Sequence, residues 1–438
     1  MTFLNKGPKL LLSEVRLKTR WLWEKGFFHL LSMNLVGQVL GFVVWLVLPR
    51  LVSSSEVAEV RILIAYSSVV QVVANWGFET PVLKFCSLKD DEHYYLGVIK
   101  AALSRITLIA SSVTLVGIGL ACCGSLTSSR RLGLWLSLML IPVPLNTISS
   151  VILCYVQARK RIKEVGKWRV IIRTLSAGLV LLATVVWKFP GFVVGTILAS
   201  LMGFALIFLQ FGRTKIKVTA IVPPKFHQYA LWALLANVAF IGSQSGDIFL
   251  LDHLISNRSS LGAYALATAF IGAAMSVPLA VQSIMVPYLS SRANDMVFIR
   301  EQHARNFRRM VPLVLLTGIG TLILVCLLKM LFYSSAYNEM PFYVVILLVK
   351  FAAVSFSAVT GGVLLSIGLV KFNFLAAFFS LITAFVVGFA LIRRFGLTGA
   401  AWSQVIQASC MFAITFYFYR KHCQQCSTSP LISTRRSY

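Results

Sequence analysis

Ionisable side chains inside long apolar stretches are the residues of this chain that could do chemistry. Asp247 lies in the apolar stretch 229–254 and directly follows the run Gly-Ser-Gln-Ser-Gly. A lipid-facing surface does not favour such a run, and an ionisable group within a membrane costs about 2.5–3.5 kcal/mol on insertion scales. Asp247 could therefore bind substrate or a coupling cation in a water-accessible lining. The alternative is a buried carboxylate that neighbouring helices satisfy.

Lys350 is the deepest base of the chain. It lies about nine residues into the stretch 341–368, which is about 13 Å along a helix that rises 1.5 Å per residue. Because its ammonium group cannot easily reach either surface, we expect it to face a cavity or pair with an acid, and we predict that it holds an anionic group. Arg105 and Arg173 lie nearer the ends of their stretches. An arginine fork suits phosphate, but arginines at that depth commonly extend to lipid headgroups.

Other polar groups in the apolar stretches are weaker candidates. Glu79, near the inner end of the stretch 60–80, could exchange a cation or could pack at the interface. Asp252 and His253 lie further along than Asp247, and we expect them to reach the outer interface. Amides in the stretches can supply the hydrogen bonds that sugars need, or can join helices to one another. These amides are Asn34, Gln38, Gln71, Asn75, Asn146, Asn237, Gln244, Gln282 and Gln404.

Motifs of soluble enzymes are missing from the sequence. It has no GxxxxGK[ST] phosphate loop, no HExxH and no Gly-rich dinucleotide turn, so we expect no ATP hydrolysis and no enzyme. His422, Cys423 and Cys426 form a single CxxC cluster without a second pair, which is weak support for zinc. We therefore predict no metal site and no cofactor beyond a coupling H⁺ or Na⁺.

About twelve apolar stretches must position these side chains. With 58% hydrophobic and 13% charged residues and a mean hydropathy of +0.82, the chain lies outside the range of soluble globular proteins. Each stretch is about long enough to cross a ~30 Å hydrocarbon core as a helix. The stretches are 28–49, 60–80, 101–123, 132–156, 170–187, 190–211, 229–254, 262–288, 310–331, 341–368, 372–392 and 397–419.

The basic residues between the stretches fall in alternating blocks. If the N-terminus is cytoplasmic, the inner segments hold 31 of the 41 Lys and Arg residues, and the outer segments hold nine, among them Arg50 and Arg61. The positive-inside rule then places both termini in the cytoplasm. The net charge of +27 is explained by insertion and anionic headgroups, so we expect no nucleic-acid partner.

A polar break near the centre divides the stretches six and six. We predict a cytoplasmic amphipathic segment at 1–27, a six-helix bundle at 28–211, a cytoplasmic linker at 212–228, a second six-helix bundle at 229–419 and a cytoplasmic tail at 420–438. The second and eighth stretches begin and end in similar sequences, which indicates two like-oriented halves around a central cavity, unless the similarity is chance. The outer loops have no room for a catalytic domain.

These residues resemble a known family. The segments that carry the resemblance are Asn34 with Gly37, Pro49 to Tyr66, the Asp247 segment leading into 261–267, Pro287 to Ser290, and 396–401. They look like the polysaccharide biosynthesis family of Wzx-type O-antigen flippases, in the superfamily that includes multidrug and toxin extruders and lipid II flippases. The Gly-x-Tyr pattern at Gly262 and Tyr264 is absent from the first half, which has Ala58 and Val60.

The resemblance implies an all-α integral membrane protein of MATE-like fold in a bacterial plasma membrane. It implies a flippase that moves an undecaprenyl-diphosphate-linked oligosaccharide, such as an O-antigen unit, from the inner to the outer face by alternating access. Lys350 would attract the diphosphate, and Asp247 or Glu79 would exchange H⁺ or Na⁺. Further cavity residues would be Arg105, Arg173, Asn34, Gln38, Asn237 and Gln244. Implied partners are the glycolipid, membrane lipids, the polysaccharide polymerase and the chain-length machinery.

Two other readings stay open. A cation-coupled multidrug extruder shares the plan of twelve spans, but extruders of cationic compounds usually need acids in the cavity, and Asp247 is the single well-buried acid that we predict. A membrane glycosyltransferase or polymerase would need a long outer loop with carboxylates or arginines, and no outer loop has room for one.

Overall fold

The computed structural model describes residues 27–88, 91–211, 219–255, 257–290, 292 and 295–428. Within these residues the chain is helical and contains no strand. The predicted segment 1–27 lies almost entirely outside the described residues, as does the end of the predicted tail. The helices are α2 (Phe27–Leu51), α3 (Ser54–Asn75), α4 (Glu79–Leu88), α5 (Glu92–Cys122), α6 (Arg130–Leu140), α7 (Val143–Ala158), α8 (Ile162–Phe211), α9 (Phe226–Leu254), α10 (Arg258–Ala274), α11 (Ser276–Ser290), α12 (Met296–Leu331), the short η1 (Ser335–Tyr337), α13 (Met340–Ser366) and α14 (Val370–Thr428).

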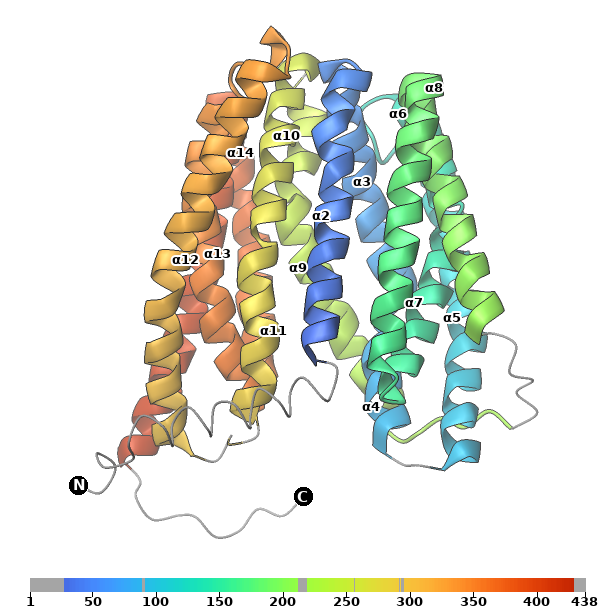
Figure 1. Ribbon diagram of the computed structural model, residues 1–438, viewed down its shortest axis with the longest axis vertical. Coiled ribbons are helices and arrows are strands. Elements are labelled where there is room, and N and C mark those ends of the chain that lie inside the picture. Colours follow the sequence, from blue (N-terminus) through green and yellow to red (C-terminus); the bar gives the residue numbers. More distant parts are fainter. Residues whose placement is uncertain are drawn as a thin grey trace.

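The helices form two groups, the first from α2 to α8 and the second from α9 to α14 (Figure 1). Helix α2 begins, and α14 ends, at the lower end of the molecule in Figure 1. We call this the inner end, because the charge pattern predicts that it is cytoplasmic, and we call the opposite end the outer end. Helix α9 packs against α14 in its own group and against α3 and α4 in the first group.

Two long helices fold back on themselves. The backbone of α8 breaks at Lys188 and that of α14 breaks at Gly396. After the first break the chain returns along its own first arm, since a Cβ at Gly195 would lie 2.8 Å from Val180 Cα. In α14 the two arms are joined by the Gln407 side-chain amide, which donates a hydrogen bond to Ser380. Each long helix is therefore an antiparallel hairpin that supplies two apolar arms.

Three of the predicted apolar stretches are divided within their length. The stretch 60–80 breaks between α3 and α4, where Trp76 adopts a left-handed conformation with φ of 49°. The stretch 132–156 breaks at Pro142, and 262–288 breaks at Met275. These breaks free backbone groups inside the bundle, which is tolerated where neighbouring helices or a cavity can satisfy them.

The described residues form a multi-pass membrane protein. Nine of their helical segments are long and apolar enough to cross a membrane, by length and composition, and the hairpins α8 and α14 each count once among them. A shorter apolar helix runs over Gly37–Leu51. The number of crossings, the bundle boundaries and the cytoplasmic placement of the termini stay predictions. Helix α14 continues to Thr428, beyond the residue where the tail was predicted to begin.

The two groups are joined at the outer end by close contacts between helix termini. A Cβ at Gly262 of α10 would lie 2.1 Å from the Ser54 carbonyl oxygen, so α10 and α3 can approach this closely because Gly262 has no side chain. The Ser54 hydroxyl donates a hydrogen bond of 2.7 Å to the Ser259 carbonyl oxygen. A second contact joins the end of α12 to α2, where the Tyr333 hydroxyl donates a hydrogen bond of 3.1 Å to the carbonyl oxygen of Leu46.

Asp252 completes this outer junction, and its predicted placement at the interface is wrong. The side chain is buried and forms an ion pair with Arg258, at 2.7 Å. It also accepts hydrogen bonds from the hydroxyl and the backbone N–H of Ser128, at 2.7 and 3.1 Å. Because Ser128 belongs to the first group and Asp252 to the second, this carboxylate links the groups instead of reaching out to the interface. His253, next to it, is exposed, and its placement at the outer interface stays a prediction.

Candidate functional site

Three ionisable side chains from three helices, one in the first group and two in the second, lie close enough to interact electrostatically. They are Arg61 of α3, Asp247 of α9 and Lys350 of α13, and Asp247 interacts electrostatically with both cations. Asp247 is 2% exposed and Lys350 is 8% exposed. Opposite charges placed together reduce the penalty of burying each one. The structure thus brings together Asp247 and Lys350, which the sequence singled out separately, and adds Arg61.

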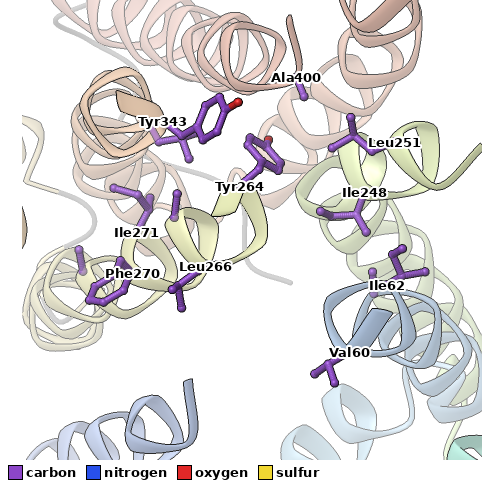
Figure 2. Packing of buried hydrophobic residues seen from close by; sticks show 14 of the residues in the cluster. Val60, Ile62, Ile248, Leu251, Tyr264, Leu266, Phe270, Ile271, Tyr343 and Ala400 are labelled. Atoms are coloured by element: carbon purple, nitrogen blue, oxygen red, sulfur yellow. The ribbon is translucent and has the colours of Figure 1, made fainter. Parts of the chain in front are cut away.

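Asp247 has one satisfied and one free carboxylate oxygen. Its Oδ2 accepts a hydrogen bond of 2.5 Å from the hydroxyl of Tyr264 on α10, whereas Oδ1 has no hydrogen-bond partner among the described residues. The rings of Tyr264 and Tyr343 pack edge to face with centroids 5.7 Å apart, in a cluster that also holds Ile62 of α3 and Ile248 of α9 (Figure 2). The free oxygen is therefore a buried acceptor beside a cluster of apolar and aromatic side chains.

The small and polar run before Asp247 serves close helix packing. A Cβ at Gly242 would lie 2.7 Å from Leu381 of α14, and one at Gly246 would lie 3.4 Å from Ala384. The Ser243 hydroxyl bonds to the carbonyl of Phe240 in its own helix. The run thus allows α9 to approach α14, which holds the Asp247 carboxylate at the boundary between the groups.

Lys350 is held inside the second group. Its ammonium group donates a hydrogen bond of 2.5 Å to Oε1 of Gln404, on the second arm of α14. Lys350 lines neither of the two cavities described below. The side chain therefore has its amide and acid partners in the protein itself, and its predicted contact with an anionic substrate stays a prediction.

The position of Arg61 differs from the one that the charge pattern predicts. It was expected in an outer segment, but it lies inside α3, about 10 Å along the helix from Ser54 at 1.5 Å per residue. Helix α3 starts early because Ser53 and Glu56 form a capping box, with the Ser53 N–H donating to the Glu56 carboxylate at 2.8 Å. The pattern Ser-x-x-Glu before an apolar run signals such a start, so this motif could have placed Arg61 in the helix.

A first cavity of about 540 Å³ lies between α2, α3, α8 and α10. Arg61 and Arg173 both line it, together with Gln38. Arg61 Nε donates a hydrogen bond of 3.3 Å to the hydroxyl of Thr268. Arg173 crosses the face of α2 at Gly37, where a Cβ would lie 2.8 Å from the Arg173 Cδ. Two guanidinium groups in one cavity can bind an anion with several oxygens, such as a diphosphate.

A second cavity of about 350 Å³ lies within the second group, between α9, α10, α11, α13 and α14. Its lining is largely apolar and contains no charged side chain among the described residues. Its polar side chains are Gln244, Gln282, Ser357, Asn373 and Thr415. Gly272 of α10 belongs to the lining of both cavities.

The remaining predicted site residues lie elsewhere. Arg105 bonds to His227 at the start of α9, and Glu79 accepts a hydrogen bond of 2.6 Å from the Asn75 amide. Asn237 is exposed. The side chain of Asn34 lies outside the described residues, as do those of Cys423 and Cys426. Among the residues that the structure describes, no group of three or more His, Cys, Asp or Glu residues could hold a metal ion.

Comparisons with known proteins agree with this architecture. A family model described as "Polysaccharide biosynthesis protein" matches residues 47–342. Among curated proteins, no sequence matches the chain. A structure of the lipid II flippase MurJ in an inward closed conformation superposes with a TM-score of 0.70 at 12% identity, covering 92% of this chain and 93% of that one.

Two further solved structures have the same fold. An inward-facing multidrug resistance MATE family transporter of the MOP superfamily has a TM-score of 0.66 at 12% identity, over 91% of this chain and 96% of that one. A MOP superfamily transporter from Pyrococcus furiosus has a TM-score of 0.60 at 12% identity, over the same shares of the two chains. At such identities the likeness shows the fold, and it confirms the predicted all-α membrane fold of MATE type.

Proposed function

Because the chain belongs to the polysaccharide biosynthesis protein family, we propose that it is a transporter of a lipid-linked saccharide. The substrate is an oligosaccharide on undecaprenyl diphosphate, and it moves from the inner to the outer face of a bacterial plasma membrane. The fold of the lipid II flippase supports the proposal. The polymerase and the chain-length machinery stay predicted partners.

The first cavity is the observation that carries the proposal. A diphosphate that crosses a membrane must exchange its water shell for fixed donors, because burying an unpaired charge is costly. Arg61 and Arg173 supply two guanidinium groups in a space of about 540 Å³. They would hold the diphosphate while the prenyl chain stays in hydrocarbon. A cavity lined by arginines is a poor place for a cationic drug, so the extruder alternative is less well supported.

Asp247 is the group that we propose couples transport to an ion gradient. Its free Oδ1 can take a proton, and its charge acts on both Arg61 and Lys350. Neutralising Asp247 would leave those two cations unbalanced and would strengthen the attraction of the first cavity for an anion. Lys350 would then act on the charge of Asp247 from within the second group, without contacting the substrate.

Transport in proteoliposomes tests the proposal. Purified protein is reconstituted with a fluorescent undecaprenyl-diphosphate saccharide, and a membrane-impermeant quencher reports how much of it reaches the other leaflet. We expect flipping by the wild type and by Arg393→Ala, which removes an exposed arginine outside the two cavities, and loss of flipping in the Arg61→Ala/Arg173→Ala double variant. A parallel assay of cationic dye transport distinguishes the multidrug-extruder alternative from the proposed flippase. Dye transport without glycolipid flipping would refute the proposal.

A further inference from the structure

We propose that the second cavity is a saccharide subsite, which binds the sugar nearest the diphosphate while the first cavity binds the diphosphate itself. This inference rests on the proposed function and extends it to the glycan. The two cavities differ in chemistry. The first holds Arg61 and Arg173, whereas no charged side chain of the described residues lines the second, so the second suits a neutral group.

The amide side chains of the second cavity are available to a ligand. Gln244 and Gln282 are half-buried, and neither amide has a hydrogen-bond partner among the described residues. Asn373 donates one hydrogen bond, of 3.0 Å, to the Gly361 carbonyl oxygen. Each amide offers both donors and acceptors, as sugar hydroxyls require. These groups come from three helices, α9, α11 and α14, so they surround a ligand and do not merely flank one helix.

The apolar part of the lining also fits a sugar ring. Phe240 contributes an aromatic ring that is 43% exposed, and the C–H face of a pyranose can pack on such a ring. The volume of about 350 Å³ lies in the range of about 300–1,000 Å³ that is usual for small-molecule sites. A mostly apolar cavity with a few convergent polar groups is also the usual form of such sites.

Gly272 places the two cavities side by side. It lines both of them, and a Cβ built on it would meet no atom within 4 Å. In a glycolipid of this class the first sugar is bonded directly to the diphosphate, so a sugar subsite must adjoin the diphosphate subsite. Because Gly272 lines both cavities, the second cavity adjoins the first, as this bonding requires.

Binding to two lipids tests the subsite. The probes are undecaprenyl diphosphate and undecaprenyl diphosphate carrying one N-acetylglucosamine, titrated against the purified full-length protein in detergent. We expect the wild type to bind the sugar-bearing lipid about tenfold more tightly, which corresponds to one or two net hydrogen bonds. Gln244→Leu/Gln282→Leu should abolish that difference and leave the affinity for the bare lipid unchanged. Equal wild-type affinities for the two lipids would overturn the subsite alone.

A substitution at Gly272 gives an independent test. Gly272→Leu places a side chain where the two cavities adjoin, and it should weaken binding of the sugar-bearing lipid more than binding of the bare lipid. Gly320→Leu is the matched control, because Gly320 is also a helical glycine with no atom within 4 Å of its Cβ, and it lies on an exposed face of α12. Equal weakening of both lipids by Gly272→Leu would mean that the sugar has no contact of its own beyond Gly272, and the inference would be wrong. If the wild type binds neither lipid, the proposed function fails with it.

Discussion

The backbone of Lys188 has nearly the same conformation as that of Gly396, with φ and ψ of 55° and −132° against 59° and −133°. Three residues further on, each hairpin has a glycine in close contact with its first arm. A Cβ at Gly191 would lie 2.0 Å from the Ala183 carbonyl oxygen, and one at Gly399 would lie 2.1 Å from that of Leu391. The hairpins of the two groups therefore turn in the same way, although the first turn has Lys where the second has Gly.

Replacing Lys188 with glycine should stabilise the protein. A positive φ combined with this ψ is open to glycine and strains a lysine by about 1–3 kcal/mol, while the added chain entropy of glycine offsets about 0.5–1 kcal/mol. We expect Lys188→Gly to raise the Tm in detergent by roughly 1–2 °C. Lys188→Ala removes the charge but keeps the strained conformation, so it should not raise the Tm. An equal rise in both variants would point to the charge instead.

Substituting either arginine of the first cavity should reduce flipping, whereas substituting a basic residue at the surface should not. Arg61→Ala and Arg173→Ala should each reduce flipping of a lipid-linked saccharide by about tenfold or more, since a hydrogen bond to a charged group contributes about 1.5–3 kcal/mol. Arg61→Lys keeps the charge but loses the fork of donors, so we expect partial activity. Initial flipping rates in proteoliposomes check this, with insertion confirmed by gel filtration. Full activity of both alanine variants would exclude the cavity as the diphosphate site.

Composition and charge were enough to predict the fold class. Apolar stretches long enough to span a membrane leave few alternatives to a helical bundle, and the structural comparisons confirm that class. Hydropathy averages over a stretch, so it did not predict the breaks at Trp76, Pro142 and Met275. Those breaks depend on local backbone conformation and on which neighbouring helices accept the freed groups.

The site was only partly accessible to sequence reasoning. Asp247 and Lys350 were recognisable because a charged residue within an apolar stretch can be identified from the sequence alone. Their common neighbour Arg61 was not, because it lies close to the polar start of α3 and was counted with the loop. Asp252 shows the same limit, since its partner Ser128 is 124 residues away in the sequence. Such pairings follow from tertiary packing and leave no periodic signal.

The charges of Asp247 and Lys350 should be thermodynamically coupled. Lys350→Met leaves Asp247 with Arg61 as its remaining cation, and Asp247→Asn leaves two cations without their acid. Removing either charge leaves the other buried with less compensation, which costs up to about 3–5 kcal/mol. We expect the double variant to be less destabilised than the sum of the single variants, with a coupling of about 0.5–3 kcal/mol, measured by thermal unfolding in detergent. Additive effects would mean that the two charges do not interact.

Transport by the same variants separates the two roles proposed for Lys350. If Lys350 contacts the anionic substrate, Lys350→Met should lose flipping even when a second substitution restores stability. If it acts through Asp247, Asp247→Asn/Lys350→Met should regain ion-independent flipping. Normal flipping by a well-inserted Lys350→Met variant would show that neither role is needed.

Asp252→Asn should open the outer end of the molecule. The carboxylate holds Arg258 of the second group and Ser128 of the first, and an amide keeps its size but loses the ion pair. In a cysteine-free background, a cysteine at Thr268 of the first cavity reports access from outside. We expect Asp252→Asn to speed its labelling in intact cells by an impermeant maleimide several-fold. Glu56→Gln is the control, because that outer carboxylate caps its own helix through Ser53. Unchanged labelling in Asp252→Asn would mean that contacts such as the one between Ser54 and Ser259 keep the outer end closed without the carboxylate.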